Sequence, residues 1–211
     1  MSQQEFLLSF ARRIGKRLSP LKKNFLDREL KKRSINNLDL TSKKQTVLEI
    51  GSGMGDFLSV LSRKNPNINF IASEPYLNGI VSLLEKSDSS KNLYIWPDDV
   101  RLLIKKIPDQ CLDLVYILFP DPWPRKNQQK RRLVSQYLLK ILHPKLKHNS
   151  SIKIATDDPN YAKWIILKFI GSKSFIWKQS KNFLDEFEEF TQTKYYKRSL
   201  HKPYFLEFSK I

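Results

Sequence analysis

Short apolar runs alternate with stretches of helical periodicity along most of this 211-residue chain, and that alternation limits the fold more than any other feature. The first run, residues 47–50, ends at a glycine-rich turn that leads into the amphipathic stretch 56–63. Later units repeat this order. The pattern predicts strands at 47–50, 68–72, 93–96, 112–119 and 152–155, helices at 56–63, 77–85, 100–106, 128–142 and 161–170, and two tail strands at 175–178 and 204–208.

Strands that are continuous apolar runs and alternate with helices are typical of a mostly parallel sheet with helices on both faces. The length of the chain fits one α/β domain of this kind. We expect that domain to span residues 46–211 and to follow a basic, partly flexible N-terminal arm at 1–45. Ligands of such sheets bind beyond the carboxyl ends of the strands. The functional site is therefore expected at that edge.

The charge of the chain favours a polyanionic partner. Thirty-eight Lys and Arg residues stand against 21 Asp and Glu residues, which gives a formal net charge of +17. Ten basic residues lie between Arg12 and Arg33, where the acids are Asp27 and Glu29 alone. This clustering favours nucleic acid over the alternative explanation, a genome rich in lysine codons.

The single cysteine, Cys111, cannot form a disulfide framework or a cysteine-based zinc site. The apolar runs are too short to span a membrane, and we expect neither a metal nor a membrane contact. A reducing, bacterial cytoplasmic location is predicted. An organellar transit peptide is the alternative, because the N-terminal segment is rich in arginine and poor in acids.

Three glycines at alternate positions, Gly51, Gly53 and Gly55, directly follow the first strand. Glycine allows positive φ and a close approach of ligand to backbone, so Gly51 and Gly53 are expected to contact a ligand. In a dinucleotide fingerprint the third glycine would stand one position later, where this chain has Asp56. An acid at a helix start disfavours a pyrophosphate and suits a cationic ligand.

Carboxylates stand at three successive strand ends of the predicted sheet. Glu74 ends the second strand, where it can accept hydrogen bonds from both hydroxyls of a ribose. Asp98 ends the third strand, within reach of an adenine amino group, and Glu49 lies below the glycines, facing an ammonium. This set favours S-adenosylmethionine, which carries an adenosine, a sulfonium and an amino acid but no phosphate. Helix caps and solvated strand ends are the alternative, and Asp99 in particular can cap the next helix.

A stiff loop follows the longest strand. Pro120 and Pro122 flank Asp121 and fix its backbone, so that its carboxylate projects from the strand end. Trp123 offers a surface on which a base can stack. Five of the eight residues 125–132 are cationic, which predicts contact with phosphates. A solvated helix face is the alternative for this run of charge.

This loop, together with residues 48–55 and Ala155-Thr156-Asp157, resembles the signature of the bacterial tRNA (guanine-N7)-methyltransferase family. The resemblance extends from about residue 12, with Arg12-Arg13-Ile14-Gly15-Lys16-Arg17, to the C-terminus. It implies the class I methyltransferase fold, a Rossmann-like sheet of seven strands, mostly parallel with the last antiparallel. It also implies S-adenosylmethionine as methyl donor, S-adenosylhomocysteine as product, and a guanosine in the variable loop of tRNA as target.

The resemblance also assigns roles to single positions, with Asp121 as the catalytic residue. The cofactor-binding set is Glu49, Gly51, Gly53, Glu74, Asp98 and Asp121; the substrate-binding set is Arg125, Asp157, Thr193, Lys194, Tyr195 and Tyr196; the RNA-contacting set is Asn127, Gln128, Gln129, Lys130, Arg131 and Arg132. Tyr196 departs from the family, which has a glutamate there. Arg125 stands where lysine is usual, and Gln128 and Gln129 stand where histidine is frequent.

The implied chemistry needs little proton transfer, because guanine N7 carries no proton and has an in-plane lone pair. We expect Asp121 or Asp157 to accept the N1–H and N2–H₂ edge of the guanine and so aim N7 at the methyl group. An exocyclic-amine RNA methyltransferase and a non-catalytic RNA-binding protein are the alternatives. The expected partner is tRNA, without an obligate protein partner, and the protein is expected to be a monomer or a homodimer.

Overall fold

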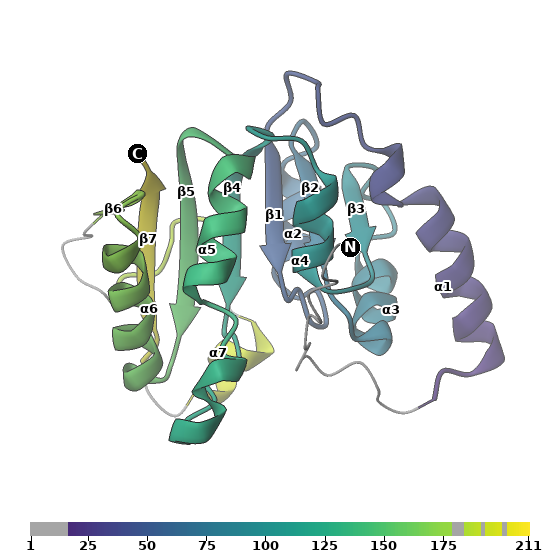
Figure 1. Ribbon diagram of the computed structural model, residues 1–211. Coiled ribbons are helices and arrows are strands. Elements are labelled where there is room, and N and C mark those ends of the chain that lie inside the picture. Colours follow the sequence, from purple (N-terminus) through teal and green to yellow (C-terminus); the bar gives the residue numbers. More distant parts are fainter. Residues whose placement is uncertain (1–16, 179–183, 191–192, 200–201) are drawn as a thin grey trace, which may run out of the picture.

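The computed structural model describes residues 17–178, 184–190, 193–199 and 202–211. Its sheet has seven strands in the order β3-β2-β1-β4-β5-β7-β6 (Figure 1). The strands β1 to β5 pair in parallel, whereas β7 is antiparallel to both β5 and β6. The predicted fold class is confirmed. The strands are β1 Thr46–Ile50, β2 Asn69–Ser73, β3 Leu93–Trp96, β4 Leu112–Leu118, β5 Leu146–Thr156, β6 Phe175–Lys178 and β7 Tyr204–Lys210.

Helices cover both faces of the sheet, and each face has its own apolar core. On one face the core includes Leu103, Leu138 and Ile165 from the helices α4, α5 and α6. On the other face it includes Leu61 and Leu83 from α2 and α3. The helices are α1 Pro20–Lys32, α2 Leu58–Lys64, α3 Leu77–Lys86, α4 Val100–Lys106, α5 Gln136–Leu142, α6 Pro159–Ser172 and α7 Lys194–Arg198, with short 3₁₀ helices η1 Ile35–Asn37, η2 Lys126–Arg131 and η3 His143–Lys145.

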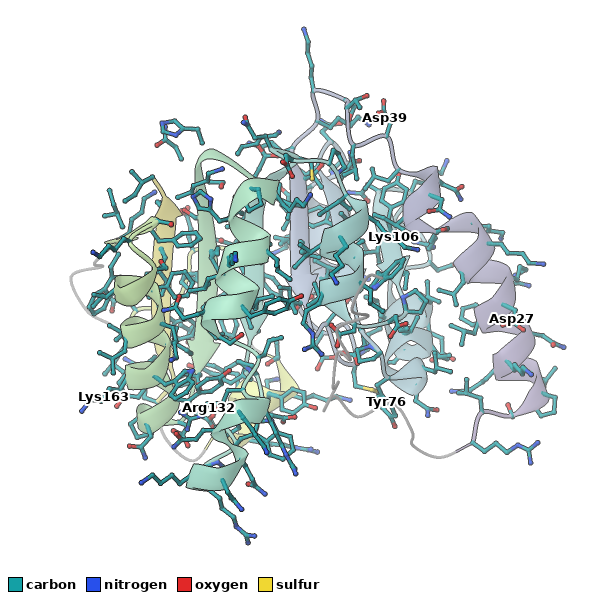
Figure 2. All side chains as sticks on the ribbon, in the orientation of Figure 1. Asp27, Asp39, Tyr76, Lys106, Arg132 and Lys163 are labelled. Atoms are coloured by element: carbon teal, nitrogen blue, oxygen red, sulfur yellow. The ribbon has the colours of Figure 1, made fainter. Side chains whose placement is uncertain are left out.

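The strand order reverses between β1 and β4, which is where an α/β sheet of this kind binds its ligand. The crossovers after β1 and β2 pass over one face, and those after β3, β4 and β5 pass over the other. Figure 2 shows Tyr76 and Arg132 at the end toward which the parallel strands point, and Asp39 at the opposite end. The loops that follow β1, β2 and β4 therefore meet at one edge.

Part of the predicted N-terminal arm is helical and docks on the domain. The Ser19 hydroxyl caps α1, and Leu26 buries against the core that α2 and α3 share. The Arg33 guanidinium donates to the backbone oxygens of Ser87 and Asp88, at the end of α3. The division of the chain at residue 45 stays a prediction. The first part of the arm, including Arg12 and Arg13, lies outside the described residues.

The helix predicted at 128–142 is wrong in its first half. Residues 126–131 form η2, and α5 begins at Gln136 after Ser135, whose hydroxyl accepts from the Leu138 N–H at 3.2 Å. Val134 lies between them, buried, with its N–H donating to the Tyr161 hydroxyl at 3.2 Å. This tertiary hydrogen bond removes a donor that a continuous helix would need, so the segment breaks there.

The strand β5 is longer than the predicted 152–155, since it starts at Leu146. Its first half contains exposed His148 and Asn149, and Asn149 has a φ of 60°. These polar residues fall in the irregular stretch between the pairs Leu112–Leu146 and Leu114–Ser151, and a hydrophobic pattern cannot identify them as part of a strand. Within the part of the chain that the structure describes, none of the helices combines the length and the apolar character needed to cross a membrane.

Candidate active site

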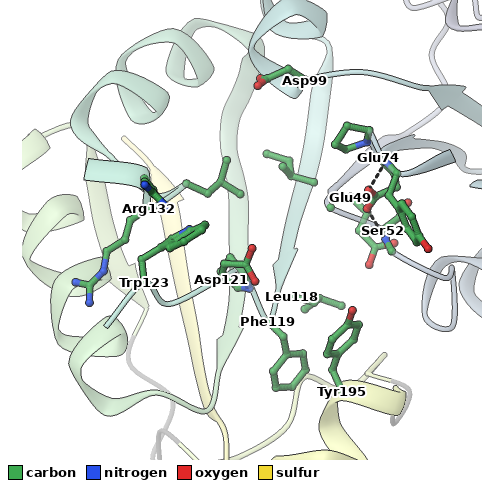
Figure 3. A pocket seen from close by; sticks show the side chains of 18 of the residues that line it. Glu49, Ser52, Glu74, Asp99, Leu118, Phe119, Asp121, Trp123, Arg132 and Tyr195 are labelled. Carbon is green, nitrogen blue, oxygen red and sulfur yellow. Dashed lines mark hydrogen bonds between the residues drawn. The ribbon is translucent and has the colours of Figure 1, made fainter. Parts of the chain in front are cut away.

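A pocket of about 680 Å³ lies beyond the carboxyl ends of β1, β2 and β4 (Figure 3). This volume lies within the range of about 300–1,000 Å³ that is usual for small-molecule sites. Five of the six predicted cofactor-binding residues line it. They are Glu49, Gly51, Gly53, Glu74 and Asp121. Of the predicted substrate and RNA residues, the lining includes Thr193, Tyr195, Lys130, Arg131 and Arg132.

The glycine turn after β1 has the backbone that the sequence predicts. Gly51, Gly53 and Gly55 have φ of 78°, 53° and 74°, values that other residues rarely adopt. A Cβ atom on Gly55 would lie 2.4 Å from the Leu83 side chain of α3, whereas one on Gly51 would meet open space. Gly55 thus lets the turn pack on α3, and Gly51 leaves the pocket floor accessible.

Glu49 is a buried carboxylate at the floor of the pocket. Its side chain comes from β1, and the residue is 3% exposed. Burial raises its pKa to about 8, and repulsion from Glu74 and Asp56 adds to the shift. Its Oε2 atom has no hydrogen-bond partner among the described residues. A buried acceptor that faces a pocket without a partner fits a cationic group, such as the ammonium of S-adenosylmethionine.

Glu74 shapes the turn as well as the pocket wall. One carboxylate oxygen accepts from the Gly53 N–H and the other from the Tyr76 N–H, both at 2.8 Å. Burial raises the pKa of Glu74 and these two backbone donors lower it; burial has the larger effect, so the pKa lies above its usual value. A carboxylate has about four acceptor positions, so hydroxyl groups of a ribose can still bind. That contact stays a prediction.

At the end of β3, the structure brings Asp99 rather than Asp98 to the pocket lining. The Asp98 carboxylate accepts from the N–H of Asp99 at 2.7 Å, and its predicted contact with adenine stays a prediction. Asp99 caps α4 by accepting from the Arg101 N–H, as the sequence allowed, and also pairs with the Arg101 guanidinium at 2.6 Å. Sequence reasoning missed Arg101, which is the second residue of α4 and belongs to no motif.

The loop after β4 is strained on both sides of Asp121. Phe119 and Trp123 have φ of 51° and 42°, which is rare and costly for bulky side chains. The Phe119 N–H donates to the Ala155 oxygen at 2.8 Å, which fixes the start of the loop on β5. Figure 3 shows Asp121 and Trp123 across the pocket from Glu49 and Glu74. An exposed acid therefore faces the buried ones.

The basic stretch after the loop is not uniform in its exposure. Lys130 is exposed, whereas the Arg131 guanidinium lies over the Trp123 ring, 4.9 Å from its centroid. Arg132 is 5% exposed, and its Nε donates to the Pro122 oxygen at 2.7 Å. Contact of these residues with RNA stays a prediction, and Arg132 is poorly placed for it. Asn127, Gln128 and Gln129 lie on η2 outside the lining.

Two predicted substrate residues lie beside the pocket rather than in it. Arg125 is exposed and precedes η2. Asp157 follows β5, the strand next to β4, and its neighbour Asp158 caps α6 by accepting from the Tyr161 N–H at 2.7 Å. Neither Arg125 nor Asp157 belongs to the pocket lining. Their roles stay predictions.

The C-terminal segment forms part of the pocket lining beside the glycine turn. The Thr193 hydroxyl caps α7, and the Tyr195 ring lies within 3.8 Å of the Cβ position at Gly53. Lys194 N–H donates to Asp56 at 3.2 Å. Tyr196 lies outside the lining and donates its hydroxyl to the Glu186 carboxylate. The hydrogen bond between Lys194 and Asp56 thus joins segments 138 residues apart in the chain at the pocket edge.

Asp56 joins that segment to the cofactor turn. Its carboxylate also accepts from the Lys86 ammonium at 2.5 Å, and Lys86 donates to the Met54 oxygen at 2.7 Å. Partial burial raises the pKa of Asp56, but Lys86 and the Lys194 N–H together lower it by more, so the pKa lies below its usual value. The sequence suggested a cationic ligand for Asp56; the structure supplies a cation from α3 instead. Sequence reasoning missed Lys86.

Known proteins resemble this chain in sequence over most of its length. A family model described as "putative methyltransferase" matches residues 43–203. A tRNA (guanine-N(7)-)-methyltransferase of Hyphomonas neptunium is 41% identical over 80% of this chain and 82% of the relative. A protein of the same name from Wolbachia pipientis wMel is 36% identical over 96% of this chain and 90% of the relative. A bifunctional methyltransferase of Rickettsia conorii is 36% identical over 91% of this chain, which spans only 37% of that relative.

Solved structures share the fold at low sequence identity. A tRNA (m1A58) methyltransferase from Aquifex aeolicus aligns with a TM-score of 0.53 at 15% identity, over 96% of this chain and 73% of that chain. An rRNA methylase from Streptococcus thermophilus gives a TM-score of 0.54 at 11% identity, over 94% of this chain and 99% of that chain. Together with the sequence matches, these findings show that the chain belongs to the tRNA (guanine-N7-)-methyltransferase family, on the class I methyltransferase fold.

Proposed function

We propose that this protein transfers a methyl group from S-adenosylmethionine to N7 of a guanosine in the variable loop of tRNA. The products are S-adenosylhomocysteine and 7-methylguanosine. One observation carries the proposal: a single pocket joins the buried, unpartnered carboxylate of Glu49 to the exposed Asp121 and Trp123 of a strained loop. The names of the sequence relatives support the tRNA guanine as target.

The floor and wall of the pocket suit the donor. Glu49 offers its free oxygen to the ammonium, and Glu74 offers remaining acceptor positions to the ribose. Gly51 allows the ligand to lie against the main chain. No phosphate is present in this donor, which agrees with three acids around the turn, since anions would repel a pyrophosphate. The described residues contain no cluster of three metal-ligating side chains.

The loop after β4 suits a purine. When bound, the donor supplies a methyl group on a sulfonium, which N7 can attack in line with its own lone pair. Asp121 accepts the N1–H and N2–H₂ edge, so it orients the base and stabilises the positive charge that develops on the ring. The Trp123 ring can stack on the base. Holding the reacting atoms in line can lower the barrier by about 7–11 kcal/mol. A general base is unnecessary because guanine N7 carries no proton.

The test is methyl transfer from labelled S-adenosylmethionine to tRNA transcripts with and without a guanosine in the variable loop. Transfer to the first alone, with 7-methylguanosine identified by nuclease digestion and mass spectrometry, is the expected result. A methylated exocyclic amine would replace this proposal with the alternative enzyme. Binding of tRNA without transfer would make the protein a non-catalytic RNA binder. The bacterial cytoplasmic location and the absence of an obligate protein partner stay predictions.

A further inference from the structure

Arg132 differs from the other cations of its stretch in being inside the protein. It is 5% exposed, whereas Arg125, Lys126 and Lys130 are exposed. Its guanidinium lies 5.0 Å from the ring centroid of Tyr161 and 4.9 Å from that of Trp164, both on α6. A cation within about 6 Å of an aromatic face is attracted to it, more strongly where water is excluded. Arg132 is thus fixed on α6 by its charge.

The two rings that contact Arg132 are themselves fixed. Tyr161 is fully buried, and its hydroxyl accepts from the Val134 N–H at 3.2 Å. The Trp164 Nε1–H donates to the Val134 oxygen at 2.8 Å. Both polar groups of the Val134 backbone therefore bind the rings that hold Arg132, two residues earlier. Residues 132–134 and the first turns of α6 form one rigid unit.

A side-chain donor of this unit reaches the reaction loop. Arg132 Nε donates to the Pro122 oxygen at 2.7 Å, next to Asp121. The loop has few hydrogen bonds of its own, because Pro120 and Pro122 have no N–H. It also contains the positive φ angles of Phe119 and Trp123, a conformation that persists only when its surroundings hold it. Phe119 is held by β5 on one side, and Arg132 holds the other side.

We infer that Arg132 is a positioning residue for methyl transfer, and that it acts through the Pro122 oxygen rather than by binding tRNA. This inference rests on the proposed function. A misplacement of the reacting groups by about 1 Å can lower a rate by about 100-fold, so loss of the Arg132 anchor should lower kcat. Because the guanidinium is buried between two rings, its loss should leave the number of phosphate contacts unchanged.

The test is the variant Arg132→Lys, which keeps the charge but loses the planar Nε donor. Expected results are a kcat lower by about 100-fold, with an unchanged KM for tRNA and an unchanged slope of log Kd for tRNA against log salt. A phosphate contact would instead raise KM at constant kcat and, in the uncharged variant Arg132→Met, would lower that slope by about 1. That pattern, or a wild-type kcat, would overturn the inference.

Two control variants bracket the result. Lys130→Ala removes an exposed neighbouring cation of the predicted RNA-contacting set and is the positive control for the salt slope, which should fall by about 1. Lys168→Met removes the cation 4.2 Å from the Trp164 ring centroid, which does not reach the loop, and should change neither the salt slope nor kcat. Thermal unfolding and S-adenosylmethionine binding establish that each variant is folded.

If Arg132→Lys does not fold, Trp164→Phe provides the same test at smaller amplitude. It removes the donor to the Val134 oxygen and weakens the ring contact, and it should lower kcat several-fold at constant KM for tRNA. An unchanged kcat in this variant would overturn the inference. If the wild-type protein makes no 7-methylguanosine, the proposed function fails, whereas an active wild type with an equally active Arg132→Lys variant refutes the inference alone.

Discussion

The two sides of the pocket are built differently. On the donor side, Glu49 and Glu74 are buried, and Glu74 accepts from the main-chain N–H groups of Gly53, in the glycine turn, and of Tyr76. On the acceptor side, Asp121 is exposed, and its loop is held by a side chain from residue 132 and a backbone bond to β5. A small cationic donor can be enclosed, while a tRNA base must enter from outside. The enclosed side is therefore preformed by backbone, and the open side is braced by side chains.

The difference implies that variants on the acceptor side change kcat, while variants on the donor side change binding of S-adenosylmethionine. Asp56 connects the glycine turn to the C-terminal segment, so its variants should affect both kcat and the binding of S-adenosylmethionine. Exposed cations should affect tRNA affinity alone.

The largest effect is expected from Asp121→Ala. Removing the carboxylate that orients the base and stabilises developing charge should lower kcat by about 100–1,000-fold. The fold and most tRNA affinity should survive, as measured by thermal unfolding and filter binding. Asp109→Asn is the matched control, because its carboxylate is exposed and pairs with Lys145 at the opposite end of β4. Near-wild-type turnover of Asp121→Ala would remove the assigned role.

Glu49→Gln should weaken the binding of S-adenosylmethionine by about 10–100-fold at pH 8, since a charged hydrogen bond contributes about 1.5–3 kcal/mol to binding. In the wild type, the affinity for S-adenosylmethionine should rise as the pH rises toward 8. The cationic ligand binds the deprotonated carboxylate, and the pKa of Glu49 in the ligand-free protein is about 8. The variant should show no such rise. Calorimetry between pH 6 and 9 measures both, and an equal pH dependence in the two proteins would exclude Glu49 as its source.

The same variant tests the burial of Glu49 without a ligand. The folded pKa is raised from 4.5 to about 8, so between these values the folded protein keeps a proton that the unfolded chain has lost. Wild-type stability should therefore fall as pH rises from 4.5 to 8. Glutamine does not titrate, so the variant lacks this loss of stability. The melting temperature of Glu49→Gln minus that of the wild type should therefore increase by several degrees between pH 4.5 and 8. A constant difference would contradict the raised pKa.

Asp56→Ala should have an intermediate effect on both sides. Without its carboxylate, Lys86 loses its partner and the Lys194 N–H loses its acceptor, so the turn and Tyr195 are less well held. We expect S-adenosylmethionine to bind about 5–10-fold more weakly, the equivalent of one charge-assisted hydrogen bond at a partly exposed site. Limited proteolysis should cut the C-terminal segment faster. Glu85→Ala, which removes an exposed acid of the same helix as Lys86, is the control. An unchanged affinity of Asp56→Ala for S-adenosylmethionine would show that the Asp56 contacts do not support the pocket.

The smallest effect is expected from Lys130→Ala. Loss of one exposed cation should weaken tRNA binding by about two- to threefold at moderate salt and lower the log–log salt slope by about 1. Turnover at saturating tRNA should not change. Filter binding at several salt concentrations measures the slope, and an unchanged slope would place the phosphates elsewhere on the surface.

Residues near one another in the chain were the ones that sequence reasoning placed correctly. The glycine turn, Glu49 at its base, and the Pro-flanked Asp121 all depend on local backbone chemistry, and all three line the pocket. Sequence reasoning missed features whose partner comes from far away. It grouped Arg132 with the exposed cations, because nothing in its own segment reveals the two rings of α6; contact of Arg132 with RNA stays a prediction. The break before α5 was missed for the same reason.

The sequence by itself determined the order of strands and helices, the positions of the acids at strand ends, and the family, because these follow from the period of apolar residues and from short motifs. The tertiary structure decided which charges face a ligand and which are already paired, as with Asp56 and Lys86 or Asp99 and Arg101. The reason is physical: burial and partners fix the state of a charge, and both depend on segments that meet only after the chain has folded.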